Sequence, residues 1–549
     1  MTLRFGTDGV RGRAGTELTP ELVLALGRAA ATVTGVAGLP FVVGRDTRLS
    51  GPLLQAAFSA GVAAEGYDVV DLGVIPTPGV ADIAVERGTP AAIISASHNP
   101  FADNGIKLLS AGGRKLTDHQ EAAVEEALAR LLAPGPTGGE TSGDSTMSAR
   151  RSGAGLGRLT TDHGAVDRYC ERVAAALEGR TVAGLRVAVD CAHGASSGTA
   201  RRILARAGAD VVAVLADRPD GVNINDRCGS TDPSGLAAAV VEHRADLGLA
   251  FDGDADRVIA VDETGTVVDG DRLIALFAAD LAARGRLAGP GVAVTVMTNL
   301  GFHRAMADAG VEVVTTPVGD RSILDALEER DWTLGGEQSG HIIFRGLVSA
   351  GAGVGAGVGV GAGVGGGAGG GGGGVGAGAG VSGGAGVGGE GGGEGVDGGA
   401  GRPGLAPTGD GVLTGLLLLD LVARRGQPFS AMASRSMQRF PQVLVNVRVA
   451  DHRSLADAGP VWEEVRRIEA GLGRTGRVLI RPSGTEPLVR VMVEAASEDR
   501  ASAAAERLSA VVLDSLGPPP ADVTGPDREL DHGGDPGRPA RPGPAGQLP

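Results

Sequence analysis

Three aspartates at alternate positions, Asp252, Asp254 and Asp256, are the strongest candidates for chemistry in this sequence. Side chains at alternate positions of an extended segment point the same way, so the three carboxylates should converge. Mutually repelling anions are costly without a cation, and oxygen ligands favour Mg²⁺ or Ca²⁺. An EF-hand would need a longer loop ending in a glutamate, which does not follow at that spacing. A solvated acidic turn is the alternative, but the small residues Gly253 and Ala255 allow a tight bend around an ion.

A serine in the segment SASHNP is the second candidate. Ser97 is followed by His98, Asn99 and Pro100. A serine exposed at a strand end can act as a nucleophile or carry a phosphate. An ordinary turn, which Pro100 favours, explains the same residues equally well. This loop alone leaves both interpretations open.

Two further loops carry groups that suit a sugar and a phosphate. Glu337 and Ser339 can accept and donate hydrogen bonds to sugar hydroxyls, whereas His341 by itself is more simply a structural histidine. The segment 481–486 and Arg490 combine guanidinium groups, hydroxyl groups and a glycine N–H, which suit a dianionic phosphate. A plain β-turn is the alternative for that segment.

Each of these loops lies at the end of a predicted strand. Strands at 91–95, 247–252 and 477–482 precede Ser97, the aspartates and the phosphate loop. Short apolar strands that alternate with helical patterns predict mostly parallel α/β sheets. Such sheets form their sites beyond the carboxyl ends of the strands. The predicted fold class is therefore α/β, with three similar mixed α/β domains and a smaller C-terminal α+β domain.

The expected domain boundaries follow from composition. We predict a first domain at 1–133, a flexible linker at 134–164, a second domain at 165–268, a third at 269–430, a fourth at 431–516 and a disordered tail at 517–549. A tract at 349–401 interrupts the third domain and is nearly all Gly, Ala and Val, so it cannot build a packed core. It lacks a strict repeat, which favours a disordered insertion over a fibrous or solenoid element.

Charge and cysteine content restrict the class of partner. The formal net charge is −15, which disfavours nucleic acid and anionic lipid. The three cysteines, Cys170, Cys191 and Cys228, are odd in number and widely spaced, which indicates a reduced compartment without a disulfide framework or zinc site. Neither a signal peptide nor a run of transmembrane length is visible. We expect a cytoplasmic protein with no nucleic-acid or membrane partner, either monomer or homodimer.

Taken together, the motifs resemble the α-D-phosphohexomutases. They are FGTDGVRG (5–12), GRDTRLSG (44–51), ISASHNPFADNGIK (94–107), DGDADR (252–257), GGEQSGHIIF (335–344) and RPSGTEPLVRVMVE (481–494). They stand in the order of that family and cover 1–133, 165–346 and 404–516. The resemblance implies four domains around a central cleft, with one loop of each domain facing it. The Gly-rich tract departs from the family, because it opens a short turn after HIIF.

The resemblance also implies a role for each candidate. Ser97 would be the phosphoserine, and its phosphate would hold one Mg²⁺ with Asp252, Asp254 and Asp256. Sugar hydroxyls would bind Glu337 and Ser339. The groups expected at the non-reacting phosphate are Arg481, Ser483, Gly484, Thr485 and Arg490. The groups placed near the transferring phosphoryl, as charge stabilisers or acid/base groups, are Arg11, Lys107, Arg257 and His341.

The expected activity is the interconversion of glucosamine 6-phosphate and glucosamine 1-phosphate through a hexosamine bisphosphate, which serves as intermediate and activator. Gln338 supports the hexosamine, because methionine is common there in the phosphomannomutase and phosphoglucomutase pattern. Those two activities are the first alternative. A phosphosugar-binding regulator without catalysis and a metal-dependent phosphatase are alternatives from other classes.

Overall fold

The computed structural model describes residues 5–6, 9–133, 151–346, 404–483 and 487–518, and the backbone of 530–532. The tract at 349–401, the predicted phosphate ligands Gly484 and Thr485, and most of the tail lie outside these residues. Within the described parts of the chain, no helix combines the length and the apolar character needed to cross a membrane.

A mixed sheet forms the first unit, with the strand order β1-β5-β4-β2-β3-β7 and with β6 paired to β5. Strands β4, β2, β3 and β7 run parallel, and β5 joins β4 and β1 in antiparallel pairs. Pro20 at the start of α1, behind the capping Thr19, fixes where that helix begins. The bounds are β1 Val10–Arg13, α1 Pro20–Thr34, β2 Phe41–Arg45, α2 Gly51–Ala64, β3 Val69–Val74, α3 Thr77–Arg87, β4 Ala91–Ile94, β5 Asp103–Ser110, β6 Arg114–Lys115, α4 Asp118–Leu132 and β7 Leu159–Thr161.

Alternation along these strands divides the first unit into two layers. Val43 and Ile94 face a core shared with α1, α2 and α4. Their neighbours Val42 and Ile93 face the opposite side and join a core that includes α3 and α5. Since successive strand residues point to opposite faces, a fully apolar strand such as β4 must be covered on both sides.

The second unit is a five-stranded sheet with the order β12-β11-β10-β8-β9. Strands β10, β8 and β9 are parallel, while β11 turns back along β10 and pairs with it in antiparallel fashion. The bounds are α5 Ala165–Ala175, β8 Arg186–Asp190, α6 Ala200–Arg206, β9 Asp210–Leu215, α7 Ser234–Glu242, β10 Leu247–Phe251, β11 Val258–Asp262 and β12 Val267–Val268.

The third unit has the strand order β14-β13-β15-β16, with only the last pair antiparallel. Its bounds are α8 Gly270–Ala283, β13 Gly291–Thr295, α9 Leu300–Asp308, β14 Glu312–Thr316, α10 Asp320–Arg330, β15 Leu334–Gly336, β16 Ile342–Phe344, α11 Gly411–Arg425 and α12 Phe429–Ser436. The core that contains Val42, Ile93 and the buried face of α3 continues through the second and third units. The first three units therefore share apolar packing.

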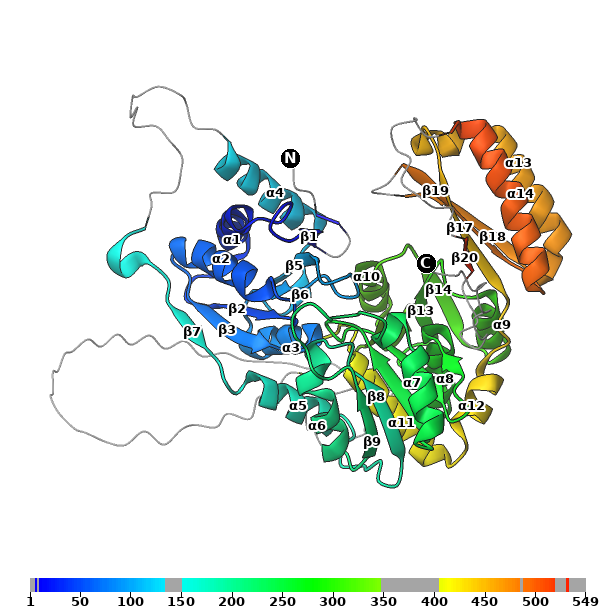
Figure 1. Ribbon diagram of the computed structural model, residues 1–549, viewed down its shortest axis with the longest axis horizontal. Helices are drawn as coiled ribbons and strands as arrows, with labels where there is room; N and C mark the ends of the chain where they lie inside the picture. The colour runs from blue at the N-terminus through cyan, green and yellow to red at the C-terminus, as the bar shows by residue number, and fades with distance from the viewer. Residues whose placement is uncertain are drawn as a thin grey trace, which may run out of the picture.

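The fourth unit is an antiparallel sheet in the order β18-β19-β17-β20, and it has its own core with α13 and α14. Figure 1 shows it in orange and red at one side of the molecule, next to α9. The bounds are β17 Gln442–Arg448, α13 Gly459–Leu472, β18 Arg477–Pro482, β19 Leu488–Glu494, α14 Glu498–Leu516 and β20 Leu530–His532.

The α/β class with a smaller fourth unit is confirmed, and two details differ from expectation. The predicted flexible linker at 134–164 contains β7, which extends the first sheet beside β3. The predicted disordered tail at 517–549 contains β20, which pairs with β17 in the fourth sheet. Neither strand was expected, because pairing with a neighbouring strand of a sheet is a tertiary effect that local composition conceals.

Candidate active site

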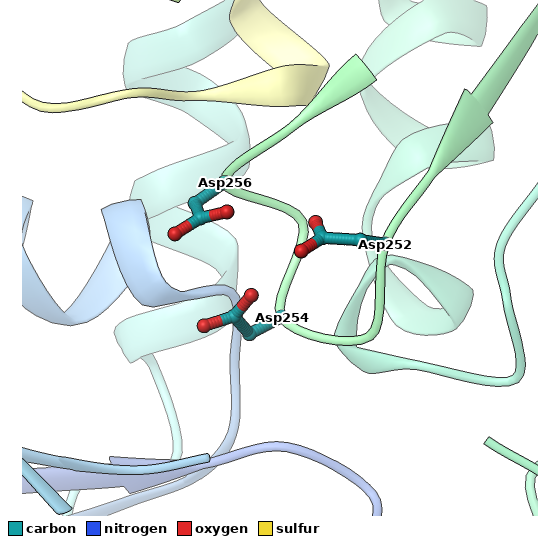
Figure 2. A group of neighbouring side chains, drawn as sticks. All are labelled: Asp252, Asp254 and Asp256. Atoms are coloured by element: carbon teal, nitrogen blue, oxygen red, sulfur yellow. The ribbon is translucent and has the colours of Figure 1, made fainter. Parts of the chain in front are cut away.

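The loop between β10 and β11 brings three carboxylates together. Asp252, Asp254 and Asp256 are buried, and one oxygen from each lies within 4.8 Å of the other two (Figure 2). The antiparallel pairing of β10 with β11 forces a tight turn, and Ala255 in it adopts the left-handed φ of 58°. Gly253 is required for a close approach, because a Cβ there would lie 2.6 Å from the carbonyl oxygen of Ser97.

The electrostatics of this triad suit a divalent cation. Burial and the neighbouring carboxylates raise the pKa of Asp252 well above its ordinary range. Burial also opposes ionisation of Asp254 and Asp256, but Lys107 and other partners hold their pKa values below the ordinary one. The Oδ1 atoms of Asp254 and Asp256 are buried and accept no hydrogen bond from the described residues. Such oxygens are the ligands that a hard cation would satisfy.

Ser97 follows β4 and its hydroxyl points into the triad. The Oγ atom donates a hydrogen bond to Oδ2 of Asp252 over 2.5 Å. The residue is buried and has a φ of 52°, in the left-handed region that a side chain other than glycine rarely adopts. A hydroxyl from the first unit therefore lies directly against a carboxylate from the second.

Lys107 and Thr77 support the carboxylates from the first unit. The Lys107 ammonium on β5 lies 2.9 Å from Oδ2 of Asp254 and 3.4 Å from Oδ2 of Asp256. Thr77, at the start of α3, donates its hydroxyl to Oδ2 of Asp254 over 2.6 Å and its N–H to the carbonyl of the same residue over 2.9 Å. Sequence reasoning missed Thr77, because no motif or spacing connects it to the aspartates.

Two arginines surround the Ser97 loop. A guanidinium nitrogen of Arg257 lies 3.0 Å from Nδ1 of His98, and Arg11 donates to the Asn99 side chain over 3.3 Å. Burial, followed by Arg257 and Arg11, lowers the pKa of His98 to about 4, so the imidazole is neutral near pH 7. Arg11 and Arg257 thus bring positive charge close to the Ser97 hydroxyl.

His341 connects the triad to the third unit. Its Nδ1 atom lies 3.7 Å from Asp256 and its Nε2 atom 3.7 Å from Asp320. Burial alone would lower the pKa of His341, but Asp256, Asp320 and Glu337 outweigh it and raise the value. The N–H of Gly409 donates to Nε2 over 3.2 Å, which fixes the ring orientation. The histidine therefore belongs to the carboxylate cluster rather than to an apolar core.

The predicted sugar loop is the turn between β15 and β16. Glu337 accepts hydrogen bonds from the Gly319 N–H over 3.2 Å and from the Ser339 hydroxyl over 3.4 Å. The loop packs directly on the strand that follows the triad, since a Cβ at Gly340 would lie 2.1 Å from the carbonyl oxygen of Val258. The sugar loop and the carboxylate loop are therefore in contact.

The phosphate loop lies on the fourth unit, and β18 and β19 stand apart from the first unit in Figure 1. Arg481 and Arg490 are direct partners across β18 and β19. Burial and the neighbouring Arg490 lower the pKa of Arg481. Two guanidinium groups face to face are unfavourable, and an anion between them would relieve the repulsion. Ser483 is buried at the end of β18.

Four family models match this chain, one for each structural unit. They are described as phosphoglucomutase/phosphomannomutase alpha/beta/alpha domains I, II and III, over residues 2–133, 167–265 and 269–361, and the C-terminal domain, over residues 444–511. The chain belongs to the phosphoglucomutase/phosphomannomutase family, the α-D-phosphohexomutases.

Curated relatives cover nearly the whole chain. A protein of Frankia alni named phosphoglucosamine mutase is 45% identical over 94% of this chain and 100% of its own length. The protein of the same name from Thermobifida fusca is 44% identical over 94% of this chain and 99% of its own.

Solved structures agree on the fold. A phosphoglucomutase/phosphomannomutase family protein from Burkholderia thailandensis superposes with a TM-score of 0.66 at 21% identity, over 93% of this chain and 97% of that one. The N-acetylphosphoglucosamine mutase of Aspergillus fumigatus, solved with GlcNAc-6P and magnesium, gives a TM-score of 0.60 at 18% identity, over 94% of this chain and 96% of that one. At these identities the likeness concerns the fold alone.

Proposed function

We propose that this chain is a phosphoglucosamine mutase that interconverts glucosamine 6-phosphate and glucosamine 1-phosphate for amino-sugar nucleotide (UDP-N-acetylglucosamine) synthesis in the cytoplasm. The observation that carries the proposal is the 2.5 Å contact between the Ser97 hydroxyl and Asp252 inside a buried carboxylate triad. The relatives of that name, which match over nearly their full length, support the choice within the family. The partner is a small phosphosugar, with no role for nucleic acid or a membrane surface.

In this account Ser97 carries the phosphoryl group that is transferred. Bound by Asp252, Asp254, Asp256 and the Ser97 phosphate, Mg²⁺ would supply the charge neutralisation that phosphoryl transfer requires. Lys107, Arg11 and Arg257 would add positive charge around the same oxygens. Lys107 suits this role because it already lies 2.9 Å from Asp254.

The reaction runs in two balanced transfers. In the first, a sugar hydroxyl attacks phosphorus, the bond from phosphorus to Ser97 Oγ breaks, and a bisphosphorylated sugar forms. The proton of the hydroxyl passes through a basic group, for which His341 is the candidate, and ends on Ser97 Oγ. In the second, the bisphosphate is held in the opposite orientation and its other phosphoryl group moves to Ser97. The same bisphosphate would activate an unphosphorylated enzyme.

Substrate recognition would fall to the third and fourth units. Glu337 and Ser339 would bind the sugar, and Arg481, Ser483, Gly484, Thr485 and Arg490 would bind the phosphate that does not react. The carboxylate of Glu337 suits a sugar with an ammonium group at C2. Discrimination between amine and hydroxyl at one contact amounts to about 1–3 kcal/mol, so glucose phosphates should be slower substrates rather than inert.

The test is a substrate comparison with Mg²⁺, with and without a hexose bisphosphate. We expect the highest kcat/KM for glucosamine phosphate and activation by the bisphosphate. A higher kcat/KM for mannose or glucose phosphate would favour a phosphomannomutase or phosphoglucomutase. Absence of turnover with all three sugars would favour a phosphosugar-binding regulator.

A further inference from the structure

A buried arginine lies beneath the Ser97 loop, outside the groups considered so far. Arg48 is 1% exposed and is the largest fully buried side chain in the described parts of the chain. It follows β2, in the segment between that strand and α2. A guanidinium group in such a position is stable only when its donors are satisfied.

All five N–H donors of the Arg48 side chain are used, and four of them reach carbonyl groups of the Ser97 loop. One terminal nitrogen donates to the carbonyls of Ser97 and Asn99 over 2.9 and 2.8 Å. The other donates to the carbonyl of Asp103 over 3.0 Å and to that of Pro100. The rigid guanidinium plane therefore sets where these carbonyls lie.

Asp46 holds the guanidinium and also reaches the loop. Its Oδ2 atom accepts the Arg48 Nε–H over 2.9 Å and the Ser95 hydroxyl over 2.7 Å. The Ser95 hydroxyl in turn accepts the N–H of Ser97 over 2.9 Å. Both the N–H and the carbonyl of Ser97 are thus fixed from the same segment, which accounts for the persistence of its left-handed φ of 52°.

The second unit also donates hydrogen bonds to the carbonyls of the Ser97 loop. The Asn225 amide donates to the carbonyl oxygens of Ser97 and Asn99 over 2.9 and 3.0 Å. The segment that holds Arg48 docks on this unit as well: the Thr47 hydroxyl donates to the carbonyl of His193 over 2.6 Å, and the Leu49 N–H to that of Gly221 over 2.8 Å. These contacts lock the Ser97 loop of one unit to the unit that carries the three aspartates.

We propose that Arg48 and Asn225 are positioning residues for phosphoryl transfer: by fixing the Ser97 carbonyl between the first two units, they aim Ser97 Oγ at the metal-binding carboxylates. The inference rests on the proposed function, because transfer from Ser97 is the process that they serve. Neither side chain touches the reacting atoms. Phosphoryl transfer depends mainly on positioning and charge, so a displaced Ser97 loses rate rather than substrate affinity.

The experiment compares Arg48→Lys and Asn225→Gly with a matched control. Lysine keeps the charge but not the planar fork. Glycine removes the Asn225 amide and tolerates its φ of 59°. Arg172→Lys is the control, because Arg172 is also nearly buried and binds Asp82 through two nitrogens at 2.7 and 2.9 Å, between α5 and α3. Each protein is assayed for kcat and KM, for the thermal midpoint, and for the share of Ser97 phosphoryl that passes to water instead of sugar.

We expect kcat to fall about 100-fold in Arg48→Lys and about tenfold in Asn225→Gly, on the scale of a 1 Å misplacement. KM should stay within about twofold and the share lost to water should rise. Arg172→Lys should lower the thermal midpoint about as much as Arg48→Lys does, and it should keep kcat within about twofold of wild type. If Arg48→Lys does not fold, Asn225→Gly decides. A kcat within about twofold of wild type in Asn225→Gly, or the same pattern in the control, would overturn the proposal.

Mn²⁺ affinity, measured by paramagnetic resonance without substrate, separates this proposal from the proposed function. Withdrawal of Ser97 from the triad should weaken Mn²⁺ binding about tenfold in both variants but not in the control, since an oxygen ligand is displaced. A wild-type protein without transfer activity, in which Mn²⁺ affinity still depends on Arg48, would overturn the proposed function alone. Unchanged Mn²⁺ affinity in both variants would count against the positioning role.

Discussion

The buried carboxylates beside Ser97 are costly to fold in the absence of a cation. Asp252, Asp254 and Asp256 come from a single loop, and Lys107 neutralises part of their charge. The pKa of Asp252 is raised by burial and then by its two neighbours, which is the behaviour of an acidic cluster short of positive charge. These three aspartates are therefore the residues that metal binding should stabilise most.

A prediction about single residues follows from this charge. Addition of Mg²⁺ should raise the free energy of unfolding of the wild-type protein by about 3 kcal/mol at a concentration of 100 times Kd. Asp254→Asn should lose most of this increase together with the activity, since one ligand and one charge are removed. The measurement is urea unfolding with Mg²⁺ and with EDTA.

Asp262→Asn is the matched control for that measurement. Asp262 is buried on β11 of the same unit, but its carboxylate caps the turn at Thr264 and Thr266. This variant should lose stability and keep the response to Mg²⁺. Equal Mg²⁺ responses in Asp254→Asn and wild type would show that the triad does not hold the ion.

Residues are predictable from sequence where the chemistry itself sets their spacing. The three aspartates were found because alternate carboxylates in one loop must converge. Thr77 and Arg48 were not assigned a role, although Thr77 contacts Asp254 and Arg48 contacts the carbonyl of Ser97. Their partners are 177 and 49 residues away along the chain, and only the packing of the units brings them together.

At the scale of the elements, helix α11 begins beside the carboxylate loop, and its N-cap residue is titratable. Asp410 is the N-cap of this helix, and its carboxylate accepts the Leu413 N–H and the hydroxyl of the buried Tyr169. Burial raises the pKa of Asp410 from 3.8 to about 7. The next residue, Gly411, donates its N–H to the carbonyl of Ala255 in the carboxylate loop over 3.0 Å.

This raised pKa predicts a pH dependence of stability. The folded protein holds the Asp410 proton up to about pH 7, whereas the unfolded chain releases it near 3.8. Ionisation of Asp410 therefore lowers the free energy of unfolding. This effect is absent below pH 4, grows as the pH rises and is complete above pH 7, with an upper limit of about 4 kcal/mol. Asp410→Asn keeps a good N-cap and removes the titration.

The test is urea unfolding of both proteins from pH 4 to pH 8. The free energy of unfolding of Asp410→Asn minus that of wild type should increase through this range and then level off. A difference that is constant with pH would contradict the assignment of the raised pKa to Asp410.

The contact between the sugar loop and β11 gives a prediction at the same scale. Gly340 has a φ of 89°, and a Cβ there would lie 2.1 Å from the carbonyl oxygen of Val258. Gly340→Ala should therefore displace the loop, reduce kcat/KM strongly and destabilise the protein. Gly310→Ala is the control, because Gly310 has a φ of 69° and nothing within 4 Å of a Cβ.

Gly310→Ala should lower the free energy of unfolding by about 1–2 kcal/mol, because alanine disfavours the left-handed backbone conformation. It should leave kcat/KM unchanged. Unfolding curves and steady-state kinetics on the two variants check both statements. Comparable kinetics for both substitutions would show that contact with β11 does not set the position of the sugar loop.

Helices and strands were predictable from the sequence where a run of apolar residues ended at a recognisable turn. Strand β18 was predicted at 477–482, its observed bounds, because a short run of apolar residues ends at a turn. Strand β7 lay hidden in a segment rich in Gly, Ser and Thr, and all of its residues are exposed. It exists because the open edge of β3 offers a parallel partner, which local composition does not reveal.

At the scale of the whole molecule, one core joins three units and a separate core holds the fourth. Hydrogen bonds join the third unit to the fourth unit and to the segment that leads into β17. Asn299 exchanges two hydrogen bonds with the backbone of Phe440, and Glu494 accepts the Leu300 N–H over 3.0 Å. A polar junction beside two independent cores is the arrangement expected of a unit that can reorient as a body.

Independent cores predict independent opening. Leu508→Ala, in the core of α14, should lower the stability of the fourth unit by about 2–5 kcal/mol and accelerate amide exchange in β17, β18 and β19. Protection of β10 and β11 should not change. Leu249→Ala, equally buried in the large core, should produce the reverse pattern. Equal acceleration in both regions by either variant would show that the four units unfold as one.

The most direct test of the central claim follows the phosphoryl group on Ser97. Protein phosphorylated with a radioactive label is mixed with excess glucosamine 6-phosphate and Mg²⁺, and a single turnover is quenched at intervals. The account predicts that peptide mass spectrometry finds the phosphate on Ser97 before mixing, and that the label then appears in glucosamine bisphosphate and in glucosamine 1-phosphate. Ser97→Ala should neither carry nor transfer it. Label that stays on the protein, passes only to water, or is found on another residue would contradict the account.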